Sequence, residues 1–226
     1  MKVAILLIAT GEKYHQYIQP FIESAKQYLK FDHDVILWTD SYKDYGTKFH
    51  FMKESFGYPD ETLMRYHTFL ERMSILFEYD FLLYSDVDML WASDVQLDEV
   101  VSTGVTATLH PGYVGRVGTP ERRPQSMAYV PLGTNNKYFC GGFNGGTVQA
   151  FTSMAIYIKS CVEIDARKGI TPVWHDESYL NRYLLDYPPA RILTPSFCWP
   201  EGCDGKYTSW TESYPAKLVA LTKGPR

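Results

Sequence analysis

An α/β fold built around a largely parallel sheet is the architecture that this sequence predicts. Short, continuous apolar runs alternate with longer amphipathic segments through roughly the first 90 residues. Continuous apolar runs are typical of strands that are buried on both faces of a sheet, whereas apolar spacings of three and four residues are typical of helices. The 226 residues fit one domain with a sizeable core. We therefore expect a single compact α/β domain over residues 1–226.

The first half of the chain predicts elements in the order β-α-β-β-α-β. The apolar run KVAILLIA predicts the first strand, and a helix is expected over 15–30, with Pro20 as an early interruption. A second, longer helix is expected over 60–78. We expect strands at 2–9, 34–40 and 47–52, a strand that ends at 85, and a stripe on the second helix made of Leu63, His67, Leu70, Met73 and Phe77. This order predicts a ligand site at the carboxyl ends of the strands, as in nucleotide-binding sheets.

The second half begins with a long connection. Residues 111–137 are rich in glycine, proline and polar side chains, and so long a connection in a compact domain is usually functional. The glycine-punctuated run YFCGGFNGGTVQAF predicts a strand, and a helix is expected over roughly 150–168. A last helix is expected within TPVWHDESYLNRYLLDYPP, where Pro188 and Pro189 end it.

The composition excludes several classes of protein. A formal net charge of -4 argues against general binding of nucleic acid, which needs a basic surface. The N-terminal run VAILLIA is too short to cross a bilayer and has no signal-peptide cleavage pattern. The four cysteines form no CxxC pair, and reduced thiols are in keeping with the cytoplasm. We expect a soluble, cytoplasmic protein that neither spans a membrane nor binds nucleic acid.

A pair of carboxylates follows the strand that ends at residue 85. In FLLYSDVDML, Asp86 and Asp88 are two positions apart, so their side chains point the same way in an extended chain. Like charges this close are unfavourable unless a cation or a set of donors lies between them. Mg²⁺ and Mn²⁺ take such oxygens and usually share the site with substrate phosphates. A metal site and a solvated strand end with turn-forming aspartates both fit the pattern.

Phosphatases of the haloacid-dehalogenase type carry a similar sequence motif, DxDx(T/V), whose first aspartate is the nucleophile. In this chain Leu90 stands at the fifth position, and the motif begins at residue 86 rather than near the N-terminus. The phosphatase is therefore the weaker interpretation.

A second cluster of polar side chains lies at the expected start of the last helix. VWHDESYLN places Trp174, His175, Asp176 and Glu177 in a row. Acidic residues in a first turn favour the helix dipole, and an aspartate is a good N-cap. A carboxylate pair beside an indole and an imidazole is also suited to gripping a sugar and stabilising an oxocarbenium-like centre. Residue types alone leave both interpretations open.

Taken in order, several stretches resemble glycosyltransferase family 6, which includes the histo-blood-group A and B transferases and the α1,3-galactosyltransferases. The resemblance rests on DVD, HPGY, ERRPQSMAY, GGFNGG and WHDESYLNRYLL, spread over roughly residues 3–200. It implies a GT-A fold, with a nucleotide-sugar half over approximately 1–108 and an acceptor-binding and catalytic half over 109–226.

The resemblance also implies roles for individual residues. Asp86 and Asp88 match the motif that holds a metal, usually Mn²⁺ and otherwise Mg²⁺, against the diphosphate of a UDP-sugar. Glu177 matches the carboxylate that faces the anomeric carbon, and Arg72 the arginine that reaches the donor sugar and the first aspartate. Positions that match donor contacts are Ala9, Thr10, Tyr14, Arg72, Asp86, Val87, Asp88, Gly112, Gly141, Gly142, Asp176 and Lys223. Positions that match acceptor contacts are His110, Thr119, Trp174 and Glu177.

The implied reaction is transfer of N-acetylgalactosamine from UDP-N-acetylgalactosamine to the 3-hydroxyl of a galactose in an oligosaccharide acceptor, with retention of the α configuration. Gly112 and Gly142 match positions near the donor sugar where family members that use N-acetylgalactosamine carry glycine, and an acetamido group needs volume that a larger side chain would fill. A fucosylated, H-type acceptor is implied by the resemblance. The alternative within the class is an α1,3-galactosyltransferase that uses UDP-galactose. Outside it, a carbohydrate-binding protein without activity is disfavoured by the intact DVD and Glu177.

Overall fold

The computed structural model of the chain describes residues 1–134, 137–203 and 213–222. Its strands are β1 (Val3–Ala9), β2 (Asp34–Thr39), β3 (Phe49–Met52), β4 (Phe81–Ser85), β5 (Met89–Trp91), β6 (Val105–Leu109), β7 (Phe139–Thr147), β8 (Arg191–Leu193), β9 (Trp199–Pro200) and β10 (Leu218–Ala220). Its α-helices are α1 (Glu12–Tyr28), α2 (Asp60–Leu63), α3 (Arg65–Leu70), α4 (Met73–Leu76), α5 (Leu97–Val100), α6 (Val148–Arg167) and α7 (His175–Asp186), with 3-10 turns η1 (Pro111–Tyr113) and η2 (Pro195–Cys198).

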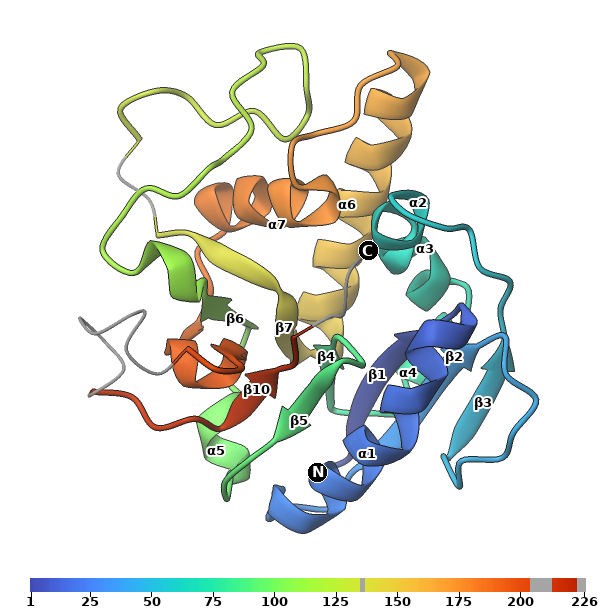
Figure 1. The fold of residues 1–226 in the computed structure, drawn as a ribbon. Helices are drawn as coiled ribbons and strands as arrows, with labels where there is room; N and C mark the ends of the chain where they lie inside the picture. Colours follow the sequence, from blue (N-terminus) through green and yellow to red (C-terminus); the bar gives the residue numbers. More distant parts are fainter. Residues whose placement is uncertain (135–136, 204–212, 223–226) are drawn as a thin grey trace.

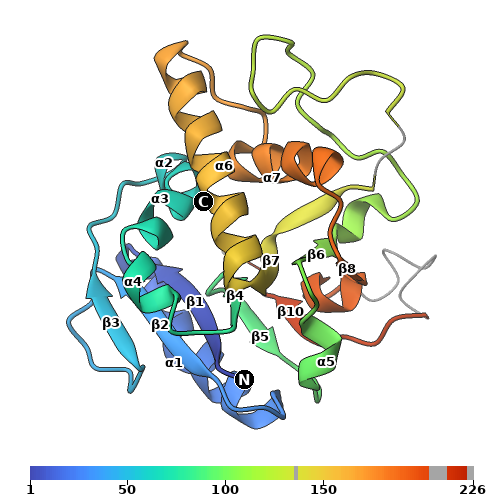
Figure 2. The same cartoon turned by 180° about the vertical axis from the view of Figure 1, so that it is seen from behind.

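A seven-stranded sheet forms the centre of the fold, with its strands in the order β3-β2-β1-β4-β7-β6-β8 (Figures 1 and 2). The first four strands in this order are parallel to one another. β7 is antiparallel to both of its neighbours, β4 and β6, and β8 is parallel to β6. As a result, the carboxyl ends of β1, β2, β4 and β6 lie at the same edge of the sheet as the amino end of β7. This mixed α/β sheet confirms the predicted fold class, of the GT-A type.

Both faces of the sheet are covered, which explains why β1 is apolar throughout. Ala4 and Leu6 belong to the core that includes residues of α3, α6 and α7, whereas Val3, Ile5 and Leu7 pack in the core that includes residues of α1. Alternate residues of a strand point to opposite faces, so a strand between two layers needs apolar side chains at every position. Figure 1 shows α1 in front of the sheet, and Figure 2 shows α6 on the opposite side.

A small second sheet, in the order β5-β10-β9, was not predicted from the sequence. β10 pairs antiparallel with β5, directly after the DVD motif, and the backbone N–H of Leu221 donates to the carbonyl of Asp88 over 2.9 Å. Trp91 of β5 is buried edge-on to the rings of Phe143 and Phe197. Residues far apart in the chain therefore support the backbone on which Asp88 sits.

The single helix predicted over 60–78 is wrong. The segment forms three short helices, α2, α3 and α4, which are separated at Met64 and at 71–72. The buried side chains are also not the predicted stripe: Arg65, Tyr66 and Phe69 are buried, whereas Phe77 is 50% exposed. The breaks change the direction in which successive turns face, so that α3 delivers an arginine toward the strand ends while Phe69 and Leu76 still enter the core.

The other predicted elements are confirmed within a few residues. The strands at 2–9, 34–40 and 47–52 correspond to β1, β2 and β3, and the helices expected over 15–30 and 150–168 correspond to α1 and α6. α7 ends at Asp186, just before Pro188, as predicted. In the described part of the chain, each helix is too short or too polar to cross a membrane.

The corrected face of the 60–78 segment makes a prediction about stability. Phe69 is fully buried, and its ring lies within 6.2 Å (between centroids) of the rings of Trp38, Tyr66, Tyr84 and Phe151. Replacing it by alanine should lower the free energy of unfolding by about 3–5 kcal/mol through lost burial and a residual cavity. The matched control Phe77→Ala should lower it by about 1 kcal/mol or less. Urea unfolding of both variants measures this difference. Equal losses of unfolding free energy in the two variants would support the buried stripe that the sequence predicted.

Candidate active site

The candidate site lies where the carboxyl ends of β1, β4 and β6 meet the amino end of β7. Thr10 follows β1, Asp86 follows β4 and His110 follows β6, while Gly141 and Gly142 lie near the start of β7. Side chains from strands far apart in the sequence reach one edge because the sheet topology aligns these ends. This is the edge at which ligands bind in open α/β sheets.

Two cavities adjoin at this edge. The β1 cavity, of about 200 Å³, is lined by Thr10, Tyr14, Tyr58, Val87 and Asp88, among others. The α7 cavity, of about 390 Å³, is lined by residues that include His110, Gly141, Gly142, Trp174, Asp176 and Glu177. Thr62, Arg65 and Asp86 line both cavities, so these three residues form the seam between them.

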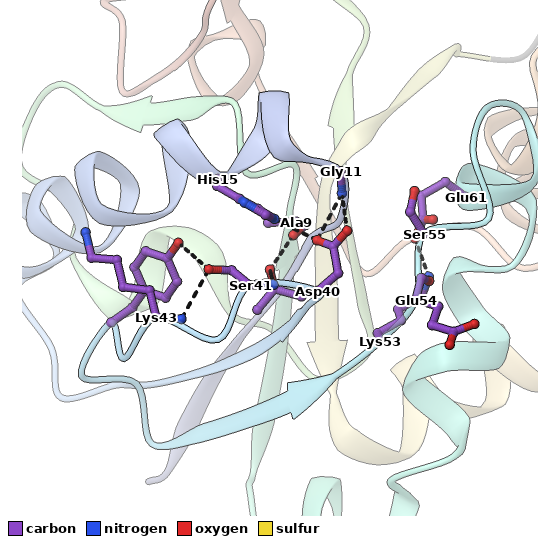
Figure 3. Close-up of polar contacts among 12 residues, drawn as sticks. Ala9, Gly11, His15, Asp40, Ser41, Lys43, Lys53, Glu54, Ser55 and Glu61 are labelled. Carbon is purple, nitrogen blue, oxygen red and sulfur yellow. Dashed lines mark hydrogen bonds and ion pairs between the residues drawn. The ribbon is translucent and has the colours of Figure 1, made fainter.

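The turn after β1 is fixed by Asp40, at the end of β2. Both carboxylate oxygens of Asp40 accept from the backbone N–H of Gly11 over 3.0 Å, and His15 Nε2 lies 2.6 Å from Oδ1 (Figure 3). Burial alone would raise the pKa of Asp40, but the hydrogen bonds from His15 and Gly11 outweigh it and lower the pKa. Gly11 has a φ of 84°, a left-handed conformation that favours glycine. The turn thereby presents Thr10 to the β1 cavity.

Arg65 stands at the seam and contacts carboxylates from two different elements. Its Nη2 lies 3.1 Å from Asp86 Oδ1, and its Nη1 lies 2.9 Å from Asp176 Oδ2. Nη1 also donates to the carbonyl of Gly141 over 3.2 Å, and the guanidinium lies over the Tyr84 ring at 4.3 Å. Burial opposes its charge, but Asp176 and Asp86 raise the pKa of Arg65 above its ordinary value, so it stays protonated. The Tyr84 hydroxyl donates to Asp86 as well.

The first turn of α7 holds two carboxyl groups with raised pKa values, of which Asp176 is buried and Glu177 is partly buried. Burial, opposed by Arg65 and assisted by Asp86, raises the pKa of Asp176 to about 6. Burial also raises the pKa of Glu177 to about 7, although the backbone N–H of Gly141 donates to Oε2 over 2.8 Å and opposes the shift. Both groups therefore titrate near neutral pH, a property common among residues at functional sites.

Asn181 fixes α7 against β7. Its carboxamide accepts from the backbone N–H of Phe139 over 2.9 Å and donates to the Phe139 carbonyl over 2.8 Å. His175, the first residue of the helix, has a φ of 49°, which is uncommon for a residue other than glycine and often marks a functional site. Its ring packs edge-on to Tyr58, 4.9 Å between centroids, so the two cavities are also joined here.

His110 is a neutral group in the α7 cavity. Burial lowers its pKa to about 4. Its Nδ1 accepts from the backbone N–H of Gly112 over 3.0 Å, so the proton of the neutral ring is on Nε2. His110 is thereby left with one ring N–H to offer a ligand.

The glycines of CGGFNGGT serve two different purposes. Gly141 and Gly142 line the α7 cavity. Gly145 and Gly146 pack between strands: a Cβ on Gly145 would lie 2.4 Å from the carbonyl oxygen of Leu82, and one on Gly146 would lie 2.5 Å from that of Gly104. The second pair is therefore required by the sheet and not by a ligand.

Most predicted site residues lie at the two cavities. Thr10, Tyr14, Val87 and Asp88 line the β1 cavity, Asp86 lines both, and His110, Gly141, Gly142, Trp174, Asp176 and Glu177 line the α7 cavity. Thr119 accepts from the Trp174 indole N–H over 2.6 Å, at the rim of the α7 cavity. Ala9 is buried behind the β1 cavity, where its carbonyl accepts from the Thr39 hydroxyl. Lys223 lies outside the described residues.

The predicted contact of Arg72 with the first aspartate is wrong. Arg72 is exposed, between α3 and α4, and its guanidinium lies over the ring of Phe51 on β3, 4.8 Å from the centroid. Arg65, seven positions earlier, makes the contact with Asp86. Arg72 was assigned by its resemblance to the family motif. On one continuous helix, positions seven apart share a face, so the predicted helix did not distinguish Arg65 from Arg72.

Arg65, Tyr84 and Tyr58 are site residues that the sequence did not predict. Arginine is rarely buried unless it is paired with an acidic group. The sequence therefore gave no reason to expect Arg65 in the interior of the protein. Tyr84 lies two positions before Asp86, on the same side of the strand, and this spacing was the available signal.

A larger hollow, of about 610 Å³, lies at the opposite edge of the sheet. It is lined by Lys26, Lys30, Asp34 and Lys48, around the amino end of β2. Since ligands of open α/β sheets bind outside the carboxyl ends of the strands, we assign the site to the two adjoining cavities.

Comparison with known proteins yields one family. Residues 58–211 match the model of glycosyltransferase family 6. Histo-blood group ABO system transferase 1 of Rattus norvegicus is 31% identical over 221 residues, which cover 91% of this chain and 62% of the relative. The chain thus spans less than two thirds of that protein.

Two further relatives extend the comparison. Globoside alpha-1,3-N-acetylgalactosaminyltransferase 1 of Gallus gallus is 34% identical over 131 residues, 55% of this chain and 36% of the relative. The O-antigen biosynthesis glycosyltransferase WbnI of Escherichia coli is 26% identical over 232 residues, 99% of this chain and 95% of the relative. The match to the bacterial protein extends over nearly the full length of both chains.

The raised pKa of Glu177 predicts how its removal changes stability with pH. A carboxyl group whose pKa rises from 4.5 to about 7 on folding stabilises the protein below pH 4.5, and this contribution is lost as the pH rises through 7. Glu177→Gln, which is neutral throughout, should therefore gain about 1–3 kcal/mol over wild type between pH 5 and pH 8. Urea unfolding at both pH values measures this, with the exposed Glu71→Gln as control. A difference that does not change with pH would contradict the shift.

Proposed function

The chain belongs to glycosyltransferase family 6, and from this premise we propose that it transfers N-acetylgalactosamine from UDP-N-acetylgalactosamine to a galactose 3-hydroxyl. The reaction would retain the α configuration and need a divalent metal, and the acceptor would be a galactose-containing glycan, of which a fucosylated, H-type glycan is one candidate. Names of relatives support this choice, since the chicken relative is named as an alpha-1,3-N-acetylgalactosaminyltransferase.

The observation that carries the proposal is the seam between the cavities. A UDP-sugar has a nucleotide at one end, a sugar at the other and a diphosphate between them. The β1 cavity at the strand ends suits the nucleotide, and the α7 cavity, with its indole and carboxyl groups, suits the sugar and its acceptor. The diphosphate would then lie at the seam, beside Arg65 and Asp86.

Charge supports a divalent ion at this seam. Five acidic residues line the two cavities among the described residues, Glu61, Asp86, Asp88, Asp176 and Glu177. They face two basic residues, Lys13 and Arg65, and Glu61 is also paired with Lys53. A diphosphate would add further negative charge, which is unfavourable without a cation. Asp86 and Asp88 offer the hard oxygen ligands that Mn²⁺ or Mg²⁺ prefers, with phosphate oxygens completing the coordination.

The described part of the chain holds no cluster of three or more His, Cys, Asp or Glu placed to bind a metal by itself. The aspartate pair nevertheless fits an ion shared with the donor, because both carboxylates line the β1 cavity. Such an ion, when bound, would neutralise the charge that develops on UDP as it leaves.

Protein groups would orient the sugar and stabilise the reacting carbon. Glu177 in its ionised form places negative charge in the α7 cavity, where it can stabilise a positive anomeric centre. Asp176, fixed by Arg65, would hold the donor sugar, and Arg65 takes the role first assigned to Arg72. His110 Nε2, Thr119 and Trp174 would bind the acceptor.

Space near Gly142 supports the N-acetyl donor. A Cβ at this position would lie 3.2 Å from Asp86 Oδ2 and 3.4 Å from Met89 Sδ, so any larger residue would reduce the room beside the first aspartate. At Gly112 a Cβ would meet the His110 ring at 3.4 Å. Gly142 lines the α7 cavity and leaves volume there for an acetamido group, which UDP-galactose does not need, whereas Gly112 lines neither cavity.

The aspartate pair gives the test of the metal. UDP release from UDP-N-acetylgalactosamine should depend on Mn²⁺, and Asp88→Asn should lower the metal-dependent rate about 100-fold or more by removing a charged ligand. Calorimetry should show tight UDP binding to wild type only with Mn²⁺. Asp98→Asn, an exposed carboxylate on α5, is the matched control. Turnover that is independent of metal and unchanged in Asp88→Asn would indicate that the DVD motif is a solvated strand end and not a metal site.

Gly142 gives the test of the donor. The rate with UDP-N-acetylgalactosamine should exceed that with UDP-galactose, and Gly142→Ala should lower this ratio about tenfold, since one methyl group removes volume on the side of the acetamido group. Gly141→Ala is the comparison, because its Cβ would meet Glu177 and Arg65 at ordinary distances of 3.5–3.7 Å and should affect both donors alike. Faster turnover of UDP-galactose by wild type would favour the galactosyltransferase.

A further inference from the structure

The motif ERRPQSMAY has no part in the proposed reaction, yet it holds buried polar groups. Glu121 and Ser126 are 3% and 5% exposed. The segment 121–129 belongs to the long connection between β6 and β7, and its hydrogen bonds run to α6, to α7 and to the segment between them. Buried polar groups with a full set of partners restrict a segment to one arrangement.

Glu121 and Arg123 form a clamp on the residues that precede α7. Glu121 Oε2 accepts from the backbone N–H of Val173 over 2.9 Å and from Arg123 Nη2 over 2.7 Å. Glu121 Oε1 accepts from Arg123 Nε and from its backbone N–H. Arg123 Nη2 also donates to the carbonyl of Thr171 over 2.5 Å. One carboxylate and one guanidinium therefore tie the long connection to residues 171–173.

The clamp lies next to both partners of a contact on the acceptor side. Val173 directly precedes Trp174, and Thr119 lies two positions before Glu121. The indole N–H of Trp174 donates to Thr119 Oγ1 over 2.6 Å, and Thr119 in turn donates to the Tyr113 hydroxyl over 3.2 Å. Trp174 is 45% exposed, so packing alone does little to fix its ring. Its position depends on the backbone at 173, which the clamp holds, and on Thr119, which lies two positions before Glu121 in the chain.

We propose that Glu121 is a positioning residue for the acceptor: through Val173 and Arg123 it holds the wall made of Trp174, Thr119 and Tyr113. This inference rests on the proposed function of the α7 cavity. The donor side is fixed separately, since Glu177 is held by Gly141, and α7 by the contacts of Asn181 with Phe139. Loss of the clamp should therefore affect the acceptor and leave the donor unaffected.

The other end of the same motif supplies a matched control. Asp165 of α6 is fully buried and accepts from Ser126 Oγ over 2.7 Å, from the Met127 N–H over 2.9 Å and from the Tyr179 hydroxyl over 3.1 Å. These contacts hold the motif to the helices but involve no residue of the acceptor wall. Ser126→Ala thus weakens the motif without touching the clamp.

The kinetic test compares Glu121→Gln with Ser126→Ala. A carboxamide has one acceptor oxygen, so in either orientation its NH₂ group must face donors of Arg123, and in one orientation also the Val173 N–H. Glu121→Gln should raise the KM for the acceptor about tenfold or more, the effect of losing a charge-assisted hydrogen bond. The KM for the donor and the release of UDP without acceptor should stay within about twofold of wild type. Ser126→Ala should lower the melting temperature with no change in acceptor KM.

A second readout does not depend on activity. Hydrogen exchange measured by mass spectrometry should show faster exchange in the peptide that contains 171–174 for Glu121→Gln, and in the peptide that contains 126–129 for Ser126→Ala. Arg123→Lys, which keeps the charge and loses the paired contacts, should act like Glu121→Gln and serves if that variant does not fold. An acceptor KM in Glu121→Gln equal to that of Ser126→Ala would overturn the positioning role.

Failure of the inference and failure of the proposed function give different results. Wild-type protein that transfers no sugar, together with the expected exchange pattern, would overturn the proposed function and with it the acceptor role of the clamp. Sugar transfer by wild type with no change of exchange at 171–174 in Glu121→Gln would overturn the clamp alone.

Discussion

The buried guanidinium of Arg65 is the interaction on which the site depends. It is the meeting point of β4 through Asp86, of β7 through the Gly141 carbonyl and of α7 through Asp176. Carboxylates gathered at one sheet edge would repel one another, and a buried carboxylate without a partner is strongly unfavourable. One fixed positive charge makes the cluster tolerable, although the pKa values of Asp176 and Glu177 still stand near 6 and 7. The interruption of the 60–78 segment follows from the same need, because α3 must aim Arg65 at the strand ends while Phe69 fills the core.

The rest of the fold brings residues that are distant in the sequence close to the Arg65 guanidinium. β7 is antiparallel to its neighbours, so its glycine-rich start lies beside the ends of β4 and β6. Asn181 joins the last helix to this start, and Glu121 joins the long connection to the segment before the helix. The wall around Trp174 is thus assembled from loops that buried hydrogen bonds hold in place, whereas the β1 cavity is assembled at the ends of the strands. This division explains why the contacts of Glu121 and those of Asp40 stabilise different halves of the site.

Much of the fold could be predicted, for physical reasons that particular elements make clear. β1 and β2 are continuous apolar runs, and such runs are typical of strands buried on both faces of a sheet. The last helix ends just before Pro188, as expected. The 60–78 segment could not be predicted, because two apolar stripes compete there and only tertiary contacts choose between them. The β5-β10-β9 sheet pairs strands of two or three residues that are distant in the chain. Local sequence patterns do not predict pairing between such short and distant strands. In the site, motif residues such as Asp86 and Glu177 were found by pattern, while Arg65 was missed because a buried arginine is recognised by its partners.

Asp86 and Arg65 line both cavities, and this shared wall has a thermodynamic consequence. A molecule that binds in one cavity changes the charge and the hydrogen bonding of groups that the other cavity also uses. If the first ligand changes the affinity for the second by some factor, then the second must change the affinity for the first by the same factor. This reciprocity holds because the coupling free energy is a property of both ligands together. Ligands in the two cavities would therefore be coupled through the Arg65–Asp86 ion pair, and this coupling needs no movement of the fold.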